Sequence, residues 1–371
     1  MRLIFKALGK EISLAEISDL PDFQACASDV CEFLHVVTSV RLPSIPSPVS
    51  NFTTTLGIDP GAWPLLVTST QRQSYVDSLV SILKNSIQDS HNRGYLPHWA
   101  KIRSFLNNLS SPPVDQDTWR SVILTAGREH DFLSSDGLLL PTHYVTDGTS
   151  TGRLTVDSGP NFLTLPKEFR TALRPSKPGN VIANIDFSSF EPRVVAWAMG
   201  IDLSPGDVYE GIAAVHGLPD RATAKLALLS ALYGASLGNL TAQVGSRAKA
   251  QALVGKVKEQ FKVDQLEARL RDQANQGLVR NALGRPLREA VKNERVRINH
   301  FVQSTAAELA AIMFSELCDS FSWIKPLVVI HDALIVEVPG RRWRELQTAC
   351  ENVKWDGHLF PTKCEAIFPR D

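Results

Sequence analysis

The chain has no long hydrophobic run. No stretch approaches the roughly 18 apolar residues that a membrane-spanning helix needs. The N-terminal segment has only a short apolar patch, interrupted by Lys6 and Lys10, which does not read as a secretory signal. We therefore expect no association with a membrane.

Cysteine is also scarce. The five cysteines form no CxxC pair, and an odd number argues against a framework of disulfides. This excludes the small disulfide-stapled secreted domains and favours a reducing, cytoplasmic location. The cysteines are Cys26, Cys31, Cys318, Cys350 and Cys364.

The chain lacks net charge, with 39 basic and 39 acidic residues, but the charges are unevenly spread. Residues 1–150 carry 11 basic and 15 acidic residues (−4), residues 151–300 carry 21 and 14 (+7), and residues 301–371 carry 7 and 10 (−3). A positive middle segment between negative flanks is compatible with a polyanionic partner.

Length and composition describe an ordinary globular protein. The 371 residues predict two or three domains, or one catalytic unit with subdomains, and 43% hydrophobic residues suffice for a sizeable core. Residues 1–40 have helix-like apolar spacing, and a Pro/Ser-rich stretch over residues 41–50 predicts an extended linker. Helices are predicted over residues 71–109, 119–132, 193–199, 221–232, 251–276 and 295–318. We find no internal repeat and no low-complexity tract.

Two aspartates follow apolar, β-branched runs that read as buried strands. Asp186 follows Val181–Ile185, and Asp332 follows Leu327–His331. A buried acid is costly unless it is paired or bound to a metal. Two such acids brought together could hold a pair of hard divalent cations, as phosphoryl transfer uses. The alternative is that each aspartate only caps a turn at the end of its strand.

Two predicted helices carry polar residues at a spacing of four. In the first, Arg221 and Lys225 lie one turn apart and could bind a triphosphate, with Tyr233 two turns on. In the second, Arg295, Asn299 and Gln303 could donate hydrogen bonds to the acceptors of the DNA minor groove. Each pattern also fits an exposed polar face of an amphipathic helix. The turn at Thr151-Gly152-Arg153 is uninformative alone. It becomes informative only through its distance upstream of Asp186.

Together these segments resemble the family A DNA polymerases, the group of bacterial DNA polymerase I, from about Asp136 to Phe368. STGRL…PNFLTLP (150–166) is similar to the family's TGRLS…PNLQNIP, and DFSSFEPR (186–193) to DYSQIELR. RATAKLALLSALYG (221–234) resembles RxxxKxxxFxxxYG, and NALGRP (281–286) resembles TxxGRR. RVRINHFVQSTAAEL (295–309) resembles RxxxNxxxQGTAAD, and VIHDALIVEV (329–338) resembles VHDELxxEV.

The resemblance implies a role for each matching position. Asp186 and Asp332 would ligate two Mg²⁺ ions, which Mn²⁺ could replace, with the Phe187 carbonyl as a further ligand. One ion would lower the pKa of the primer 3′-hydroxyl, and the other would neutralise the triphosphate and the leaving pyrophosphate. Lys225 could protonate that pyrophosphate.

The remaining residues would bind nucleotide or DNA. Glu191 would be the steric gate against a ribose 2′-hydroxyl. The implied nucleotide-binding residues are Arg221, Lys225, Leu229, Tyr233, Glu191, Ser188 and Tyr209. The residues implied to hold the primer–template are Arg153, Gly234, Arg295, Asn299, Gln303 and His331.

Several positions depart from the family pattern. Ala333 stands where an acid usually follows His-Asp, and Leu229 replaces the fingers aromatic residue. Tyr209 replaces a phosphate-binding histidine, Ser189 a glutamine, and Leu163-Thr164 a Gln-Asn pair. Since both metal carboxylates and the Arg/Lys pair remain, these departures suggest a divergent lineage of phage or plasmid origin.

The implied fold is α+β: a right-hand polymerase with an antiparallel-sheet palm, helical fingers and a short helical thumb. We expect an N-terminal segment of unknown role over residues 1–60, a thumb over 61–145, and a palm over 146–371 with fingers inserted at about 200–290. Because the segment before residue 146 is short, we expect no 3′–5′ exonuclease domain.

The predicted function is template-directed 5′–3′ addition of dNTPs to a primer without proofreading. Primer–template DNA and dNTPs are the expected partners of a monomer in the nucleoid or the cytoplasm of a phage-infected host, with an unidentified processivity or replisome partner. Two alternatives stay open: a single-subunit RNA polymerase, against which Glu191 argues, and a catalytically inactive DNA-binding replication scaffold.

Overall fold

The computed structural model describes residues 2–7, 10–16, 23–43, 68–135, 138–234 and 237–368. The predicted linker over residues 41–50 lies mostly outside these residues. The chain divides into two compact units, Met1–Ser104 (unit 1) and Phe105–Asp371 (unit 2). No helix among the described residues is long and apolar enough to cross a membrane.

Unit 1 combines a small sheet with helices. Its strands are β1 (Arg2–Ala7), β2 (Lys10–Glu16) and β3 (Phe23–Ala25), in the order β2-β1-β3. The helices are α1 (Ala27–Val37), α3 (Ser69–Ser86) and α4 (Ser90–Asn107), whose last residues belong to unit 2. The helical spacing read in residues 1–40 is therefore wrong for β1 and β2, where an antiparallel hairpin forms instead.

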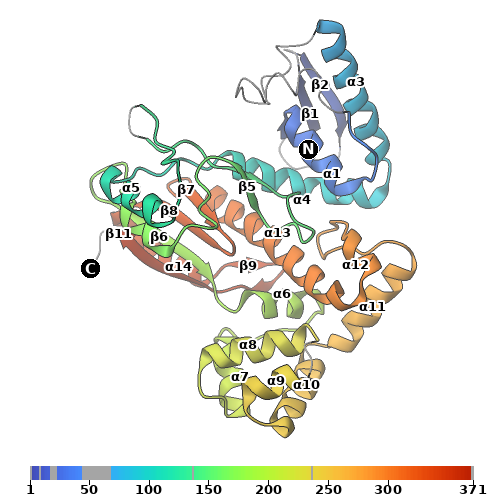
Figure 1. Cartoon of the computed structure of the whole chain (residues 1–371), viewed down its shortest axis with the longest axis vertical. Coiled ribbons are helices and arrows are strands. Elements are labelled where there is room, and N and C mark those ends of the chain that lie inside the picture. The colour runs from blue at the N-terminus through green and yellow to red at the C-terminus, as the bar shows by residue number, and fades with distance from the viewer. Residues whose placement is uncertain are drawn as a thin grey trace. The chain divides into compact units, whose positions relative to one another are not determined.

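Unit 2 is built on a four-stranded antiparallel sheet (Figure 1). Its strands are β6 (Asn180–Phe187), β7 (Lys325–Ile330), β8 (Ala333–Pro339) and β11 (Thr362–Phe368), in the order β11-β6-β8-β7. Apolar and β-branched residues dominate β6, β7 and β8, which suits strands buried in a sheet. The antiparallel palm sheet is thus confirmed.

The register of the sheet brings the two predicted aspartates together. Asp186 pairs with Ala333 across β6 and β8, so Asp332 lies at the adjacent step of the β7–β8 turn. The Phe187 amide donates a hydrogen bond to the Asp332 carbonyl at 3.3 Å. Two segments 146 residues apart in the sequence therefore meet at one end of the sheet.

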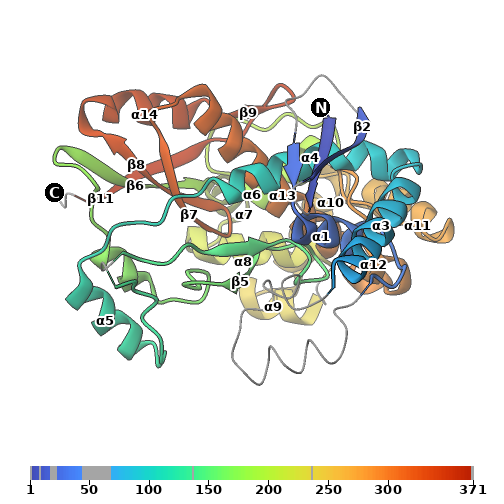
Figure 2. The ribbon, with the colours of Figure 1, turned by 90° about the horizontal axis from the view of Figure 1, so that it is seen from above.

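Helices cover the sheet. α14 (Trp343–Glu351) packs against β11 on one face, as Figure 2 shows. Another apolar cluster joins α5 (Gln116–Thr125) and the 3₁₀ turn η2 (Lys167–Ala172) to β6, β7 and β8 through Trp119, Phe169 and Ile182. The helix predicted over residues 119–132 ends at Thr125, because residues 126–132 turn away before the short bridge at Leu133.

A helical subdomain gathers at one end of unit 2, apart from the sheet (Figure 1). It contains α7 (Val208–His216), α8 (Arg221–Leu232), α9 (Leu237–Val244), α10 (Arg247–Gln260) and α11 (Val263–Asn275). Its apolar core also takes side chains from α6 (Phe190–Ala198) and α13 (Arg297–Ser320). The prediction of one or two charged helices over residues 251–276 is confirmed as the pair α10 and α11.

The remaining elements are short. They are β4 (His143–Val145), β5 (Thr155–Ser158), α12 (Arg288–Lys292), η3 (Glu294–Val296), η4 (Gly340–Arg342), β9 (Lys354–Trp355) and β10 (His358–Leu359). β4 and β5 pair as an antiparallel hairpin. The Tyr144 hydroxyl in β4 donates to the Val329 carbonyl of β7 at 2.9 Å, which fixes this hairpin to the palm.

Candidate active site

A pocket of about 380 Å³ opens where the sheet meets α6, α8 and α13. It brings together most of the predicted site residues, although they come from six separate segments of the chain. The predicted residues that line it are Arg153, Asp186, Phe187, Glu191, Tyr209, Arg221, Lys225, Gln303, His331 and Asp332.

The carboxylates of Asp186 and Asp332 form the acidic part of this pocket. Burial and the neighbouring Asp332 raise the pKa of Asp186 to about 6, although the positive charges of Arg170 and Lys225 partly oppose this. A raised pKa means that the metal-free fold disfavours the charged carboxylate. A divalent cation between the two aspartates would reverse this, so the donor set fits a hard cation.

Both aspartates lie beside backbone in the left-handed region. His331, directly before Asp332, has φ of 55°, and Ser189, which begins α6, has φ of 52°. Such values are uncommon for residues other than glycine, and they cluster at functional sites. The stacked rings of Phe187 and Phe190, 4.2 Å apart between centroids, pack across the turn that contains Ser189.

The opposite wall of the pocket is cationic. Arg221 and Lys225 project from the first turns of α8, and both lie over the ring of Tyr209, at 5.1 and 5.9 Å from its centroid. Cations at this range are attracted to an aromatic face. Tyr209 therefore acts in this structure as a platform beneath the two cations.

Asp207 holds Arg221 in place. Its carboxylate accepts from Arg221 Nε and Nη2, each at 2.8 Å, and from the Ser189 hydroxyl at 3.1 Å. It also caps α7 by accepting from the Tyr209 and Glu210 amides. Partial burial opposes its ionisation, but the Arg221 and amide hydrogen bonds hold its pKa below the usual value.

A model of DNA polymerase family A matches residues 132–355, more than half of the chain. The chain belongs to DNA polymerase family A. It is therefore a DNA-directed DNA polymerase, a nucleotidyltransferase.

A solved structure supports the same fold. The polymerase domain of Pol1 from M. smegmatis, in complex with DNA primer–template and dNTP, aligns with a TM-score of 0.61 at 16% identity. The alignment covers 92% of this chain and 81% of that one. The right-hand polymerase fold is thus confirmed. No curated protein matches the sequence.

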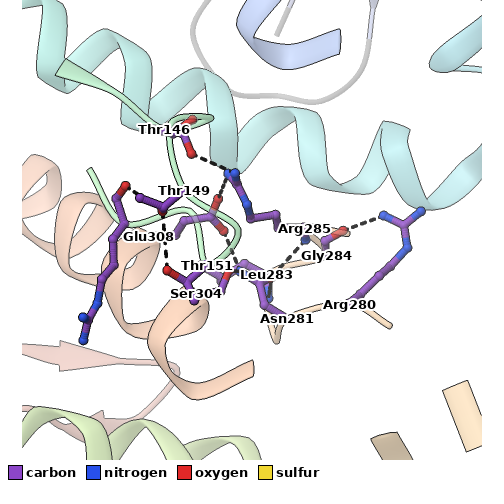
Figure 3. Close-up of polar contacts among 11 residues, drawn as sticks. Thr146, Thr149, Thr151, Arg280, Asn281, Leu283, Gly284, Arg285, Ser304 and Glu308 are labelled. Atoms are coloured by element: carbon purple, nitrogen blue, oxygen red, sulfur yellow. Dashed lines mark hydrogen bonds and ion pairs between the residues drawn. The ribbon is translucent and has the colours of Figure 1, made fainter. Parts of the chain in front are cut away.

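In this polymerase the TGR and GRP motifs contact each other. Arg285 donates to the Thr146 carbonyl at 2.8 Å and pairs with Glu308 of α13 at 3.1 Å (Figure 3). Gly152 has φ of 68°, and a Cβ there would lie 2.6 Å from Arg285 Nε. Only glycine therefore fits beside this guanidinium.

Asn281 completes this network. Its side-chain amide donates to Ser304 Oγ at 3.0 Å and to Glu308 Oε2 at 2.7 Å, both on α13. Its side-chain oxygen accepts from the Leu283 and Arg285 amides. The loop that carries Arg153 is thereby fixed to the helix that carries Gln303.

Glu191, the predicted steric gate, forms an ion pair with Arg153 and lies near Tyr233. Arg153 Nη2 lies 3.5 Å from its Oε1, and Tyr233 lies close enough to respond to its charge. Burial first, and Glu191 second, raise the pKa of the Tyr233 hydroxyl.

The other predicted residues lie outside the pocket lining. Leu229 packs on the helical core, and the exposed Gly234, with φ of 75°, follows Tyr233 after α8. The Ser188 amide donates to the Pro361 carbonyl at 2.9 Å. Arg295 lies in η3 and Asn299 in the first turn of α13, so the predicted single helix over residues 295–318 starts two residues later, at Arg297.

Sequence reasoning missed the residues that hold the site together. Arg193 of α6 is buried, and its Nη2 donates to the carbonyls of Ser204 and Gly206 at 2.9 and 2.6 Å, which fixes the loop before α7. Asp207, Arg285 and Glu308 are further examples. Arg193, Arg285 and Glu308 lie within the family-like segments 186–193, 281–286 and 295–309, but those segments did not show what these residues contact. Asp207 had a signal as an N-cap residue before a helix.

Proposed function

We propose that this polymerase extends a primer 3′-end by two-metal-ion catalysis at the Asp186–Asp332 pocket. The observation that supports it most is that one pocket contains both aspartates together with Arg221 and Lys225. Among the described residues, no group of three or more His, Cys, Asp or Glu side chains is placed to hold a metal ion without other ligands. Backbone carbonyls such as that of Phe187, the nucleotide phosphates and water would therefore complete the coordination of each Mg²⁺ or Mn²⁺.

When bound, the two ions would activate the primer hydroxyl and neutralise the charge that develops on the phosphates. In this proposal Arg221, oriented by Asp207, binds the triphosphate, and Lys225 donates a proton to the departing pyrophosphate. The ring of Tyr209 packs against both cations and helps to orient them. Leu229, Tyr233 and Ser188 complete the nucleotide site, and Glu191 excludes the 2′-hydroxyl of a ribonucleotide.

Arg153, Gln303 and His331 would contact the primer–template at the pocket, and Gly234, Arg295 and Asn299 would contact it further out. A hydrogen-bonding residue on α13 suits the acceptors common to all base pairs in the minor groove. We also propose that the protein acts as a monomer in the cytoplasm, that its source is a phage or plasmid, and that a processivity partner assists it.

A primer-extension assay with Mg²⁺ tests the central proposal. Wild type should extend a labelled primer with dNTPs in a template-dependent way and prefer dNTPs to NTPs. Asp186→Ala and Asp332→Ala should each lose extension by a factor of about 10³ or more. Their binding of primer–template, measured by anisotropy, shows that they are folded. Extension untouched by either substitution would contradict the assignment.

We further propose that the enzyme does not proofread. In the described part of unit 1, the buried carboxylates Asp29 and Glu32 both pair with Arg103, at 3.3 and 3.2 Å, so an arginine already stands where they would hold a catalytic metal ion. A primer with a mismatched 3′-terminus should therefore stay at full length when it is incubated with enzyme and Mg²⁺. Shortening of that primer, absent in a mock purification, would overturn this proposal.

A further inference from the structure

A second groove lies at the far end of the palm sheet. It forms where β7 begins at Lys325, where β8 ends at Pro339, and where the loop of residues 176–180 leads into β6. Its volume is about 700 Å³. The catalytic Asp332 lies at the opposite end of β7, about 20 Å away at the usual rise of a strand. We name this the strand-end groove.

The walls of the strand-end groove are tied together. Glu337 Oε1 accepts from the Ser176 amide and hydroxyl at 2.7 and 2.8 Å, and from Asn180 Nδ2 at 2.8 Å. The Gly340 amide donates to the Gly179 carbonyl at 2.9 Å. A Cβ on Gly340 would lie 2.6 Å from that oxygen, so the backbones approach as closely as glycine allows. The groove is therefore a preformed feature of the palm.

Positive charge is concentrated around this groove. Lys177 and Arg341 line it, and Arg344 lies in the first turn of the adjoining α14. All three are exposed, and their side chains have no charged partner among the described residues. Lys325 faces Glu337 at 3.8 Å, and Arg342 pairs with Glu345 at 2.5 Å. These five cations and two carboxylates give the groove a local charge of +3. The whole chain, by contrast, has a net charge of zero.

An aromatic side chain stands beside these cations. Trp323 lines the groove, and the Arg342 guanidinium lies over its ring at 5.7 Å. The ring of Phe321 packs against it at 5.4 Å between centroids. Contacts with Arg342 and Phe321 keep the indole in place, so little ordering is needed when a planar ligand stacks on it.

We propose that the strand-end groove binds single-stranded nucleic acid, as a second site separate from the catalytic pocket. Cations that follow a phosphate backbone, next to an aromatic ring on which a base stacks, are the features of single-strand binding. A duplex offers phosphates but keeps its base faces covered, and an acidic peptide offers charge without a base. Neither would use Trp323.

The test uses the full-length protein with its catalytic pocket already filled. Enzyme is saturated with an unlabelled hairpin primer–template that has a very short overhang. A fluorescent oligo-dT of about 16 nucleotides is then titrated by anisotropy. We expect it to bind the saturated enzyme. Oligo-rU of the same length, run in parallel, shows whether RNA or DNA is preferred.

Substitutions separate charge from stacking. Lys177→Ala/Arg341→Ala should weaken oligo-dT binding by about tenfold and flatten its dependence on salt by about 0.7 in the logarithmic slope for each cation removed. Trp323→Ala should weaken it by about fivefold or more, with the salt slope unchanged. The matched control is Arg247→Ala/Lys249→Ala, two exposed cations of α10, which should bind oligo-dT as wild type does.

Primer extension on the short-overhang hairpin should be unchanged in the groove variants, which shows that they are folded. Three results would each overturn the proposal. The first is no oligo-dT binding to the saturated enzyme, and the second is an equal loss in the control variant. The third is a combined result: polyglutamate displaces the labelled oligo-dT as well as unlabelled oligo-dT does, and Trp323→Ala binds oligo-dT like wild type. That result would identify a general anion-binding surface.

Discussion

At the scale of single residues, the buried carboxylate of Asp186 lowers the stability of the metal-free fold at neutral pH. Asp186 has its pKa raised to about 6, above its value in the unfolded chain of about 3.9. The folded state therefore binds the proton more tightly. Stability falls as pH rises between these two values, and the full cost of the buried charge is present above pH 6 or so.

Asp186→Asn should consequently be more stable than wild type without metal at about pH 8. Because the side chain is only partly buried, we expect on the order of 1 kcal/mol, or roughly 2 °C in Tm. The difference should shrink towards pH 4, as the wild-type carboxyl becomes neutral. Calorimetry in EDTA at both pH values measures it. A variant less stable than wild type at the higher pH would show that the charge is not costly.

A second prediction concerns Asp207, which orients Arg221. Asp207→Asn should raise KM for dNTPs by about tenfold with a smaller change in kcat, because the charged hydrogen bond that orients the guanidinium is lost. Steady-state extension with varied dNTP measures both constants.

Asp220→Asn is the matched control for this prediction. Asp220 caps α8 by accepting from the Thr223 amide at 2.7 Å, and it pairs with no arginine among the described residues. Asparagine keeps the side-chain oxygen that accepts from the helix amides, so both variants should retain their cap. Only Asp207→Asn should therefore alter KM. Equal KM values in the two variants would argue that Arg221 needs no such orientation.

At the scale of elements, the contact between the loop of residues 146–153 and the Asn281–Arg285 loop holds the two loops rigidly together. Gly152→Ala should destabilise unit 2 by roughly 2–4 kcal/mol, because a left-handed backbone and a contact with Arg285 both oppose the methyl group. Chemical denaturation measures the free energy of unfolding.

Gly277→Ala separates these two effects. Gly277 has φ of 79°, but no atom lies within 4 Å of the position of its Cβ. Gly277→Ala should therefore lower the free energy of unfolding only through backbone strain, by roughly 1 kcal/mol. If both variants lose the same amount, the Arg285 contact does not constrain the loop.

The sequence predicted those elements whose pattern is local. β6 and β7 are apolar runs that lead to Asp186 and Asp332, and β8 is an apolar run that follows Asp332. α8 covers residues 221–232, as its pattern predicts. β1 and β2 were misread as helical, because a short hairpin of mixed residues has no periodicity strong enough to distinguish it.

The residues that assemble the site were mostly beyond prediction. The salt bridge of Arg285 with Glu308 and the hydrogen bonds of Arg193 to loop carbonyls depend on tertiary contacts between distant segments. No spacing in the sequence marks them. The pocket residues themselves were predictable only through the family motifs, which report contacts that the sequence alone does not show.

At the scale of the whole molecule, the two units have separate apolar cores and should respond separately to perturbation. One cluster unites Phe33, Leu79 and Trp99 of unit 1, whereas the clusters around Ala227 and Ile182 belong to unit 2. Ligands of the catalytic pocket should therefore stabilise unit 2 and leave the unfolding of unit 1 largely unchanged.

Arg103→Ala tests this independence. Removing the guanidinium leaves Asp29 and Glu32 buried without their cation, which should cost unit 1 about 3–5 kcal/mol. Hydrogen exchange should report faster opening in α1 and α3, while protection of β6 and β8 stays as in wild type. The control is Arg120→Ala, an exposed pair with Asp131 that should cost under about 1 kcal/mol. Uniform loss of protection across both units would indicate a single cooperative fold.

The positive φ values of Ser189 and His331, beside two carboxylates that repel each other, have a consequence for laboratory evolution. The left-handed backbone at Ser189 and His331 and the buried charge of Asp186 each lower the stability of the metal-free fold. A screen that rewards only heat resistance should thus collect substitutions at these positions first, such as glycine at 189 and 331 and asparagine at 186. Among the resulting proteins, those with asparagine at 186 would be robust and inactive. The positions substituted in the selected variants would then identify residues of the catalytic centre without any assay of DNA synthesis.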